Sequence, residues 1–120
     1  MTHKVFYDEE KDVVRMYLIG DVTVEDAGSI ASALGAIAEK KRKHILIDVS
    51  ETRTSALMRK DVRTAMSEKF KPLGRNKTAI IGASPAIRML VKALTAMIGT
   101  SDLNQYFAQE AEALAWLKGE

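Results

Sequence analysis

Apolar residues along the chain fall into short runs that alternate with polar segments. Runs rich in β-branched and aromatic residues predict five strands, over residues 3–8, 12–19, 44–49, 77–82 and 103–107. Apolar residues spaced three and four apart predict four helices, over residues 24–39, 56–70, 85–98 and 110–117. Strands that alternate with helices form a mainly parallel sheet through right-handed crossovers. We therefore expect an α/β fold, with a mixed sheet of four to five strands, an N-terminal β-hairpin and about four helices.

The run HILIDV at residues 44–49 predicts the central strand of this sheet. It is apolar on both faces, it follows the basic cluster of residues 40–43, and a polar segment begins at Ser50. The basic cluster could contact phosphates or anionic lipid, or it could keep the end of the preceding helix in water. In open α/β sheets, ligands bind where parallel strands end. The segment after Asp48 is therefore the first candidate for a functional site.

Loops at residues 20–23, 48–55 and 82–85 each follow a predicted strand, so we expect them to meet at one edge of the sheet. Thr23 with Asp26 resembles a capping box, and Ser84-Pro85 supplies an N-cap and a first-turn proline. The side chains that we expect to contact a partner or ligand at this edge are Asp48, Ser50, Arg53, Thr54, Ser55, Arg59, Ser84 and Arg88.

An anion is one candidate ligand for the edge. Two predicted helices begin there, and helix N-termini attract negative charge through free amide groups and the helix dipole. Arg53, Arg59 and Arg88 lie in the loops or first turns. The alternative is that these arginines pair with Asp48, Glu51 or Asp61 in solvent.

Motifs for catalysis are absent from the sequence. Ser50 and Ser84 lack a nucleophile elbow, and we place both histidines, His3 and His44, at strand starts on the edge opposite these serines. Asp21, Asp48 and Glu51 could divide acid and base roles, but a carboxylate after a buried strand more often caps a loop. The chain has no P-loop and no GxGxxG sequence, and it has no cysteine with which to build a zinc site. We therefore expect no enzymatic activity, no catalytic residues, no metal and no cofactor.

The predicted helix at residues 85–98 carries more apolar residues than one contact with a sheet requires. Its main stripe, expected to cover the sheet, is Ile87, Leu90, Val91, Leu94 and Ile98. A second apolar surface consists of Met89, Ala93, Ala96 and Met97. Methionine among small residues suits a subunit, a regulatory partner or an acyl chain. The alternative is packing against neighbouring helices that carry Met66, Phe70 and Trp116.

Composition narrows the class of protein. A chain of 120 residues is the size of one domain, so we expect residues 1–120 to form a single domain. The net charge of +2 does not favour nucleic-acid binding. The N-terminus lacks a signal-peptide pattern, and no apolar run is long enough for a transmembrane helix, so we expect a cytoplasmic protein.

The order of elements, the strand end LIDVS, the turn GASPAI and the closing EAEALAWL resemble the SpoIIAA-like family of the STAS superfamily. That resemblance implies a sheet of four or five strands flanked by helices. It also implies kinship with anti-sigma factor antagonists, which bind a kinase and are switched by phosphorylation at the start of the helix after the central strand. The SpoIIAA-like branch has further been compared with the SEC14, or CRAL-TRIO, lipid-carrier fold.

Thr54 and Ser55 occupy the position of the antagonist switch. The segment has hydroxyls, but it lacks the acid immediately before them and the glycine after them. A phosphate there would lie at a helix N-terminus beside Arg53 and Arg59, whereas an unmodified hydroxyl would cap the helix.

Two functions are therefore expected as alternatives. The first is a non-enzymatic STAS-like binding or regulatory module that contacts a regulatory protein or its own copy, as a homodimer. The second is a carrier or sensor of a lipid-like or other small anionic amphiphile. Its apolar pocket would lie beside the helix at residues 85–98, with Arg53, Arg59 or Arg88 at the mouth.

Overall fold

The structure is a computed structural model, and it describes residues 3–53, 59–74 and 76–119. Its five strands are β1 (Lys4–Asp8), β2 (Val13–Tyr17), β3 (His44–Asp48), β4 (Lys77–Ile81) and β5 (Asn104–Phe107). The α-helices of the described residues are α1 (Val24–Gly35), α3 (Lys60–Phe70), α4 (Pro85–Ile98) and α5 (Glu110–Lys118). Short 3₁₀ turns are η1 (Glu39–Lys41), η2 (Lys71–Leu73) and η3 (Ser101–Leu103).

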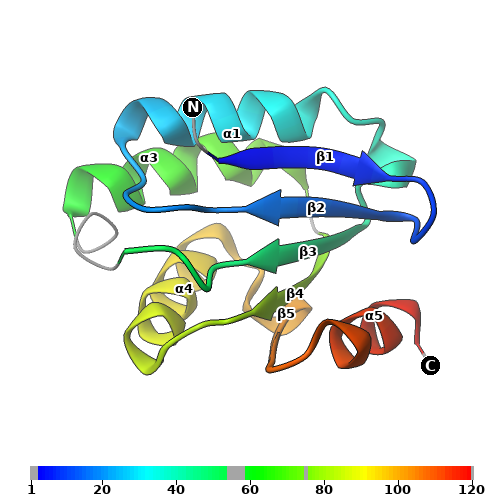
Figure 1. The fold of residues 1–120 in the computed structure, drawn as a ribbon. Helices are drawn as coiled ribbons and strands as arrows, with labels where there is room; N and C mark the ends of the chain where they lie inside the picture. The colour runs from blue at the N-terminus through cyan, green and yellow to red at the C-terminus, as the bar shows by residue number, and fades with distance from the viewer. Residues whose placement is uncertain (1–2, 54–58, 75, 120) are drawn as a thin grey trace.

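The five strands form one sheet in the order β1-β2-β3-β4-β5 (Figure 1). β1 and β2 pair antiparallel as the predicted hairpin, and the other neighbours pair parallel. β3 lies in the middle of the sheet, where Ile47 is level with Met16 of β2 and Ile80 of β4. The predicted α/β fold with a mixed, mainly parallel sheet is therefore confirmed.

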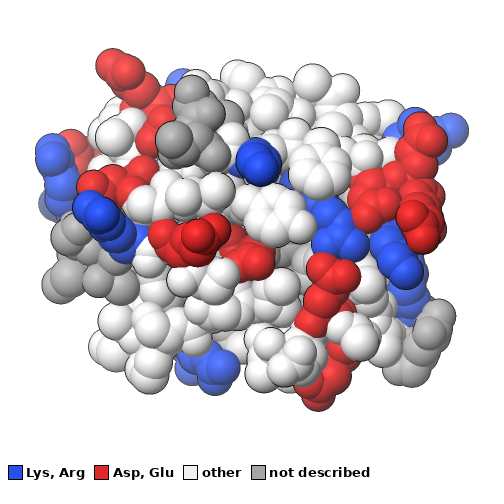
Figure 2. All heavy atoms as spheres, in the orientation of Figure 1, with Lys and Arg blue, Asp and Glu red and all other residues white. Residues whose placement is uncertain are grey.

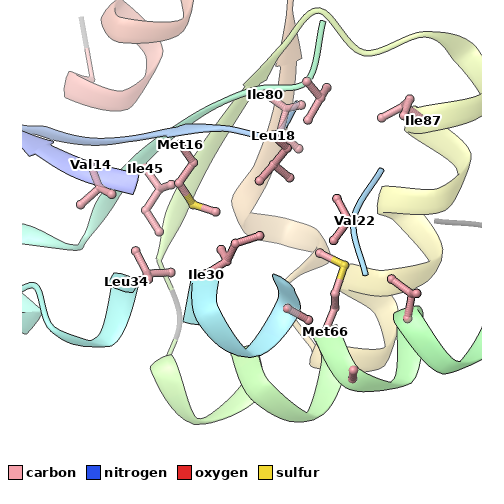
Figure 3. Close-up of a cluster of buried hydrophobic side chains, with 14 residues drawn as sticks. Val14, Met16, Leu18, Val22, Ile30, Leu34, Ile45, Met66, Ile80 and Ile87 are labelled. Carbon is pink, nitrogen blue, oxygen red and sulfur yellow. The ribbon is translucent and has the colours of Figure 1, made fainter. Parts of the chain in front are cut away.

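Helices α1, α3 and α4 cover one face of the sheet, and α5 covers part of the other (Figure 1). The larger core lies on the three-helix face, where Val14, Met16, Ile45 and Ile80 of the strands meet side chains such as Ile30 (Figure 3). The smaller core joins Val13, Leu46 and Ala79 of the sheet to Ala113 and Leu117 of α5. Both faces of the central strands are thus buried, as their apolar sequences predict. None of the described helices has the length and apolar character needed to cross a membrane.

Helix α1 ends earlier than predicted. Its capping box is present, because Thr23 Oγ1 accepts from Asp26 N at 3.1 Å and Asp26 Oδ2 accepts from Thr23 N at 3.1 Å. The helix stops at Gly35 rather than near residue 39, because glycine is a weak helix former and the chain then bends so that Ile37 packs on the core. In the basic cluster that follows, Arg42 donates to the carbonyl oxygens of Ile37 at 2.9 Å and Leu73 at 3.3 Å.

The start of α3 and the position of His3 differ from the sequence prediction in what the structure can say of them. The predicted start at residue 56 of the helix after β3 lies outside the described residues, and α3 begins at Lys60. The placement of His3 on the edge opposite the serines was wrong. Because β1 runs antiparallel to β2, the start of β1 lies where β2 ends. His44, at the start of β3, lies at the opposite edge as expected.

Candidate functional site

The loops that follow β2, β3 and β4 meet at one edge of the sheet, as predicted (Figure 1, left). Gly20 N donates to Glu51 O at 2.8 Å, and Arg53 N donates to Gly20 O at 2.8 Å, so the first two loops continue the parallel pairing. Val49 N donates to Ile81 O at 3.0 Å, which joins the second loop to the third. We call this surface, formed by residues 20–25, 48–53, 59–61 and 82–88, the loop edge.

Gly82 allows the second and third loops to approach closely. Its φ is +77°, and an added Cβ would lie 2.6 Å from Ser50 Cβ and 2.9 Å from Ser50 N. A side chain at this position would therefore collide with backbone and with Ser50. Only glycine satisfies both the left-handed conformation and the contact.

Three of the predicted site residues, Asp48, Ser50 and Ser84, form hydrogen bonds within the fold. Asp48 Oδ1 accepts hydrogen bonds from Ser50 N at 2.9 Å and from Ser50 Oγ at 2.6 Å. Ser84 caps α4, because its Oγ accepts from Ile87 N at 3.2 Å. These contacts stabilise the turns, and they are what Asp and Ser commonly do after a strand and before a helix.

Arg59 and Asp61 form an exposed ion pair at the start of α3. The Arg59 guanidinium donates to both oxygens of Asp61, with the Nη2–Oδ2 distance at 2.8 Å. This hydrogen bond raises the pKa of Arg59 and lowers that of Asp61. Asp61 Oδ1 also accepts from Val62 N at 2.9 Å. The alternative in which an arginine pairs with Asp61 is therefore the arrangement found.

The other predicted residues of the loop edge differ in their surroundings. Arg53 has an exposed side chain. Arg88 lies over the ring of Tyr106, with 5.2 Å between the guanidinium carbon and the ring centroid. Thr54 and Ser55 lie outside the described residues. The loop edge thus brings Asp48, Ser50, Arg53, Arg59, Ser84 and Arg88 to one end of the sheet.

An open cleft of about 620 Å³ lies between the loop after β2 and the start of α3. Its charged lining consists of the carboxylates of Asp21, Glu25 and Asp61 and the guanidinium of Arg59. Figure 2 shows acidic and basic side chains together at the end of the sheet where β2 and β3 stop. Carboxylates outnumber cations in the cleft, so its charge suits a basic group better than the anion expected from the sequence.

His3 is a part of this edge that the sequence pattern placed wrongly. It is buried, its Nδ1 accepts from Ile19 N at 3.0 Å, and its Nε2 lies 3.1 Å from Asp26 Oδ2. Because a backbone amide donates to Nδ1, the proton of the neutral ring lies on Nε2 and is donated to Asp26. His3 therefore links the start of β1 to the end of β2 and to α1.

The second apolar surface of α4 is exposed in the structure. Met89 is 73% exposed and Met97 is 51% exposed, and Ala93 and Ala96 are also exposed. The alternative that this surface packs against neighbouring helices is therefore wrong. Met66 and Phe70 of α3 pack in the larger core, and Trp116 packs beside Phe107 on the other face of the sheet.

An apolar cavity of about 150 Å³ lies between the sheet, α3 and α4. Arg63, Asn76 and Asn104 are among its polar lining residues. Arg53, Arg59 and Arg88, proposed from the sequence as the mouth of a pocket beside α4, do not line it. Arg63 could have been found from the sequence, since it precedes Met66 and Phe70 by three and seven residues and so shares their side of α3. Among the described residues, no group of three or more His, Asp or Glu side chains could hold a metal ion.

The loop edge, with LIDVS and GASPAI as its strand ends, can now be compared with known proteins. The sequence model of the SpoIIAA-like family matches residues 13–118. The chain belongs to the SpoIIAA-like family. The matched segment includes four of the five strands and all the described α-helices. A search among curated proteins finds no significant match.

Two solved structures share the fold across nearly the whole chain. The solution structure of the protein TM1081 has a TM-score of 0.64 and 15% identity, and the alignment covers 99% of this chain and 89% of that one. The anti-sigma factor antagonist SpoIIAA, in its unphosphorylated form, has a TM-score of 0.58 and 19% identity, with 99% and 100% covered. At these identities the similarity establishes the fold alone.

Proposed function

We propose that the protein is a non-enzymatic regulatory module that binds a protein partner at the loop edge. Membership of the SpoIIAA-like family supports this proposal, because its members are generally binding or regulatory proteins rather than enzymes. The solved anti-sigma factor antagonist of the same fold provides one example of such a role.

The observation that carries the proposal is the open cleft of about 620 Å³ at the loop edge, bordered by exposed charged side chains. Backbone hydrogen bonds hold the loop at residues 48–53 against the loop after β2. A surface fixed in this way can bind a partner without a large loss of conformational entropy. Val24, which is 44% exposed in the cleft, provides an apolar contact among the charges.

Charge reversal at Glu25 tests this function. The protein carrying Glu25→Lys and a matched variant carrying Glu10→Lys change the net charge equally. Glu25 lines the cleft, and Glu10 lies in the β1–β2 turn at the other end of the sheet. Because the charge of the cleft suits a basic group, we expect a partner isolated from the source cell to bind the wild type and Glu10→Lys equally and to bind Glu25→Lys at least about tenfold more weakly. Equal binding of all three proteins would contradict the proposal.

Phosphorylation of Thr54 or Ser55 is a proposed switch for this binding. Thr54 and Ser55 follow Arg53 in the sequence, so a phosphate on either would add about two negative charges to the segment that continues from the loop edge. We expect kinase treatment to alter partner binding by the wild type but not by the double variant Thr54→Ala, Ser55→Ala. The switch is wrong if kinase treatment leaves binding unchanged in both.

A second candidate function is the carriage or sensing of a small amphiphile. The cavity between the sheet, α3 and α4 favours it, because an apolar space of about 150 Å³ can hold a small apolar group. This function uses the interior of the protein, so it is compatible with partner binding at the loop edge.

A further inference from the structure

The cavity between the sheet, α3 and α4 has an apolar wall on three sides. Ile47 belongs to the sheet, Phe70 to α3, and Leu90 and Leu94 to α4. These four side chains remain only partly buried, although they lie on the core side of their elements. Protein interiors are normally packed without such a space, because an empty volume removes contacts from every atom that lines it. An apolar ligand would restore those contacts.

Among the described residues that line the cavity, one has a cationic side chain. Arg63 is partly buried on the side of α3 that carries Met66 and Phe70. Among the described residues, no carboxylate forms an ion pair with it, in contrast to Arg59, which is paired with Asp61. A partly buried guanidinium binds a carboxylate more favourably than an exposed one does, because water screens the pair less.

We propose that this cavity binds a small aliphatic carboxylate, with its chain between α3 and α4 and its carboxylate on Arg63. This inference deepens the second candidate function by naming the ligand class and the residue that selects it. The volume limits the chain to about six buried carbon atoms, since a cavity of this size holds one molecule of benzene. Octanoate has seven chain carbons beyond its carboxylate, so it is close to the longest chain that the cavity can hold, and it carries the charge that Arg63 selects.

Methionine methyl groups report where such a ligand binds. Met16 and Met66 line the cavity, whereas Met89 and Met97 are exposed on the outer side of α4. In protein labelled with ¹³C at the methionine methyl groups, monomeric octanoate should shift the signals of Met16 and Met66 in a saturable way. Signals of Met89 and Met97 should stay in place. Shifts confined to Met89 and Met97, or no saturable shift, would overturn the cavity as the site.

Two variants test the part played by Arg63. The substitution Arg63→Gln should weaken octanoate binding at least about tenfold and leave the binding of 1-octanol unchanged, because only the ion pair is lost. Arg88→Gln removes an arginine that does not line the cavity, and it should leave both affinities as in the wild type. Equal affinity of the wild type for octanoate and octanol would overturn the carboxylate preference while retaining the carrier function. If neither octanoate nor 1-octanol binds, both the carboxylate preference and the carrier function are contradicted.

A filled cavity gives an independent control. Leu94→Phe adds volume to the wall of the cavity and should abolish the octanoate-induced shift of Met66. Wild-type signals alone decide where the ligand binds, so the proposal remains testable even if this variant does not fold. Retention of the full Met66 shift in a folded Leu94→Phe protein would overturn the proposed position of the chain.

Discussion

At the scale of single residues, the loop edge depends on positions where one atom decides the backbone path. Gly82 is the clearest case, because its left-handed conformation and its contact with Ser50 both exclude a side chain. Asp26 is another, since it accepts hydrogen bonds from His3 and from the Thr23 amide and so joins the first strand to the first helix. Such residues hold the edge in place rather than contacting a partner themselves.

Gly82→Ala should destabilise the protein more than Gly99→Ala. Both glycines have positive φ, at +77° and +86°, so alanine is strained by about 1–2 kcal/mol at either position. Only at Gly82 would the new Cβ also collide with Ser50. Urea denaturation of the two variants measures the difference. Equal losses of unfolding free energy in the two variants would contradict the predicted collision between a side chain at position 82 and Ser50.

Asp26→Asn should lower the unfolding free energy by about 1 kcal/mol at neutral pH, because it weakens the capping box and the contact with His3. Burial raises the pKa of Asp26, but hydrogen bonds from Thr23 and His3 outweigh burial and lower the pKa below its usual 3.8. The ionised Asp26 carboxylate therefore contributes its full share of the unfolding free energy above pH 3.8. This share is lost as the pH falls through the pKa of Asp26 in the folded protein, which is lower than 3.8. Denaturation from neutral to acid pH should show the wild type and variant converging. Glu25→Gln is the control, and a difference that persists in acid would refute this account.

At the scale of secondary-structure elements, α4 combines a buried stripe with an exposed apolar surface. Ile87 is 2% exposed and packs in the larger core, whereas Met89 and Met97 lie on the outer side. The two sides should respond differently to substitution because only one of them loses packing. The exposed side is also the surface on which the sequence predicts contact with a partner or a second copy.

Ile87→Ala should cost about 2–5 kcal/mol of unfolding free energy, because it leaves a space in the core. Met89→Lys and Met97→Lys should each change stability by less than about 0.5 kcal/mol, as surface substitutions usually do. If this surface holds two copies together, the double lysine variant should also sediment as a monomer under conditions in which the wild type is a dimer. A large loss of unfolding free energy in either lysine variant would contradict the exposed positions of the Met89 and Met97 side chains.

Features of the fold that depend on neighbouring residues could be predicted from the sequence, whereas features that depend on distant contacts could not. HILIDV predicts the central strand because its apolar residues must be buried on both faces, and Ser84-Pro85 predicts the start of α4 because both residues act within one turn. The early end of α1 depends on how Ile37 returns to the core, so the periodicity of residues 24–39 could not reveal it. The position of His3 could have been predicted, because the expected hairpin already implies that the first strand starts where the second ends.

Features that arise from tertiary packing were outside the reach of the sequence pattern. An apolar pocket beside α4 was expected from the surplus of apolar residues on this helix, but the side chains of the sheet and α3 that line the cavity follow from tertiary packing, which no spacing rule describes. Likewise, the pairing of Arg59 with Asp61 was one of two alternatives, and only geometry decides between them. The loop edge itself was predictable, since parallel strands place their ends together.

At the scale of the whole molecule, Arg15 joins three parts of the fold. It lies on β2 with a 9% exposed fraction, and its guanidinium is 2.6 Å from both Asp8 Oδ2 of β1 and Glu110 Oε1 of α5. The hydrogen bond that Arg15 donates to Glu110 is the main cause that raises the pKa of Arg15, and the hydrogen bond that Arg15 donates to Asp8 lowers the pKa of Asp8. This ion-pair network fixes α5 to the sheet at the start of the helix.

Glu110→Gln should loosen α5 without unfolding the sheet. The variant loses one charged partner of Arg15, while Asp8 remains in place. Amide hydrogens of α5 should exchange faster than in the wild type, and those of β3 should keep their protection. Glu112→Gln removes the charge of a neighbouring exposed carboxylate, and it should leave the amide exchange of both α5 and β3 unchanged. Unaltered exchange in α5 of the Glu110→Gln protein would show that the network does not hold the helix.

The most direct test of the regulatory role is photo-crosslinking in the source cell. Benzoylphenylalanine replaces Arg53 at the loop edge in one protein and Lys11 at the opposite end of the sheet in another. The proposed function predicts a specific crosslink from position 53, to another protein or to a second copy of the chain, and none of that size from position 11. Crosslinking from position 11 alone, or the same products from both positions, would contradict binding at the loop edge.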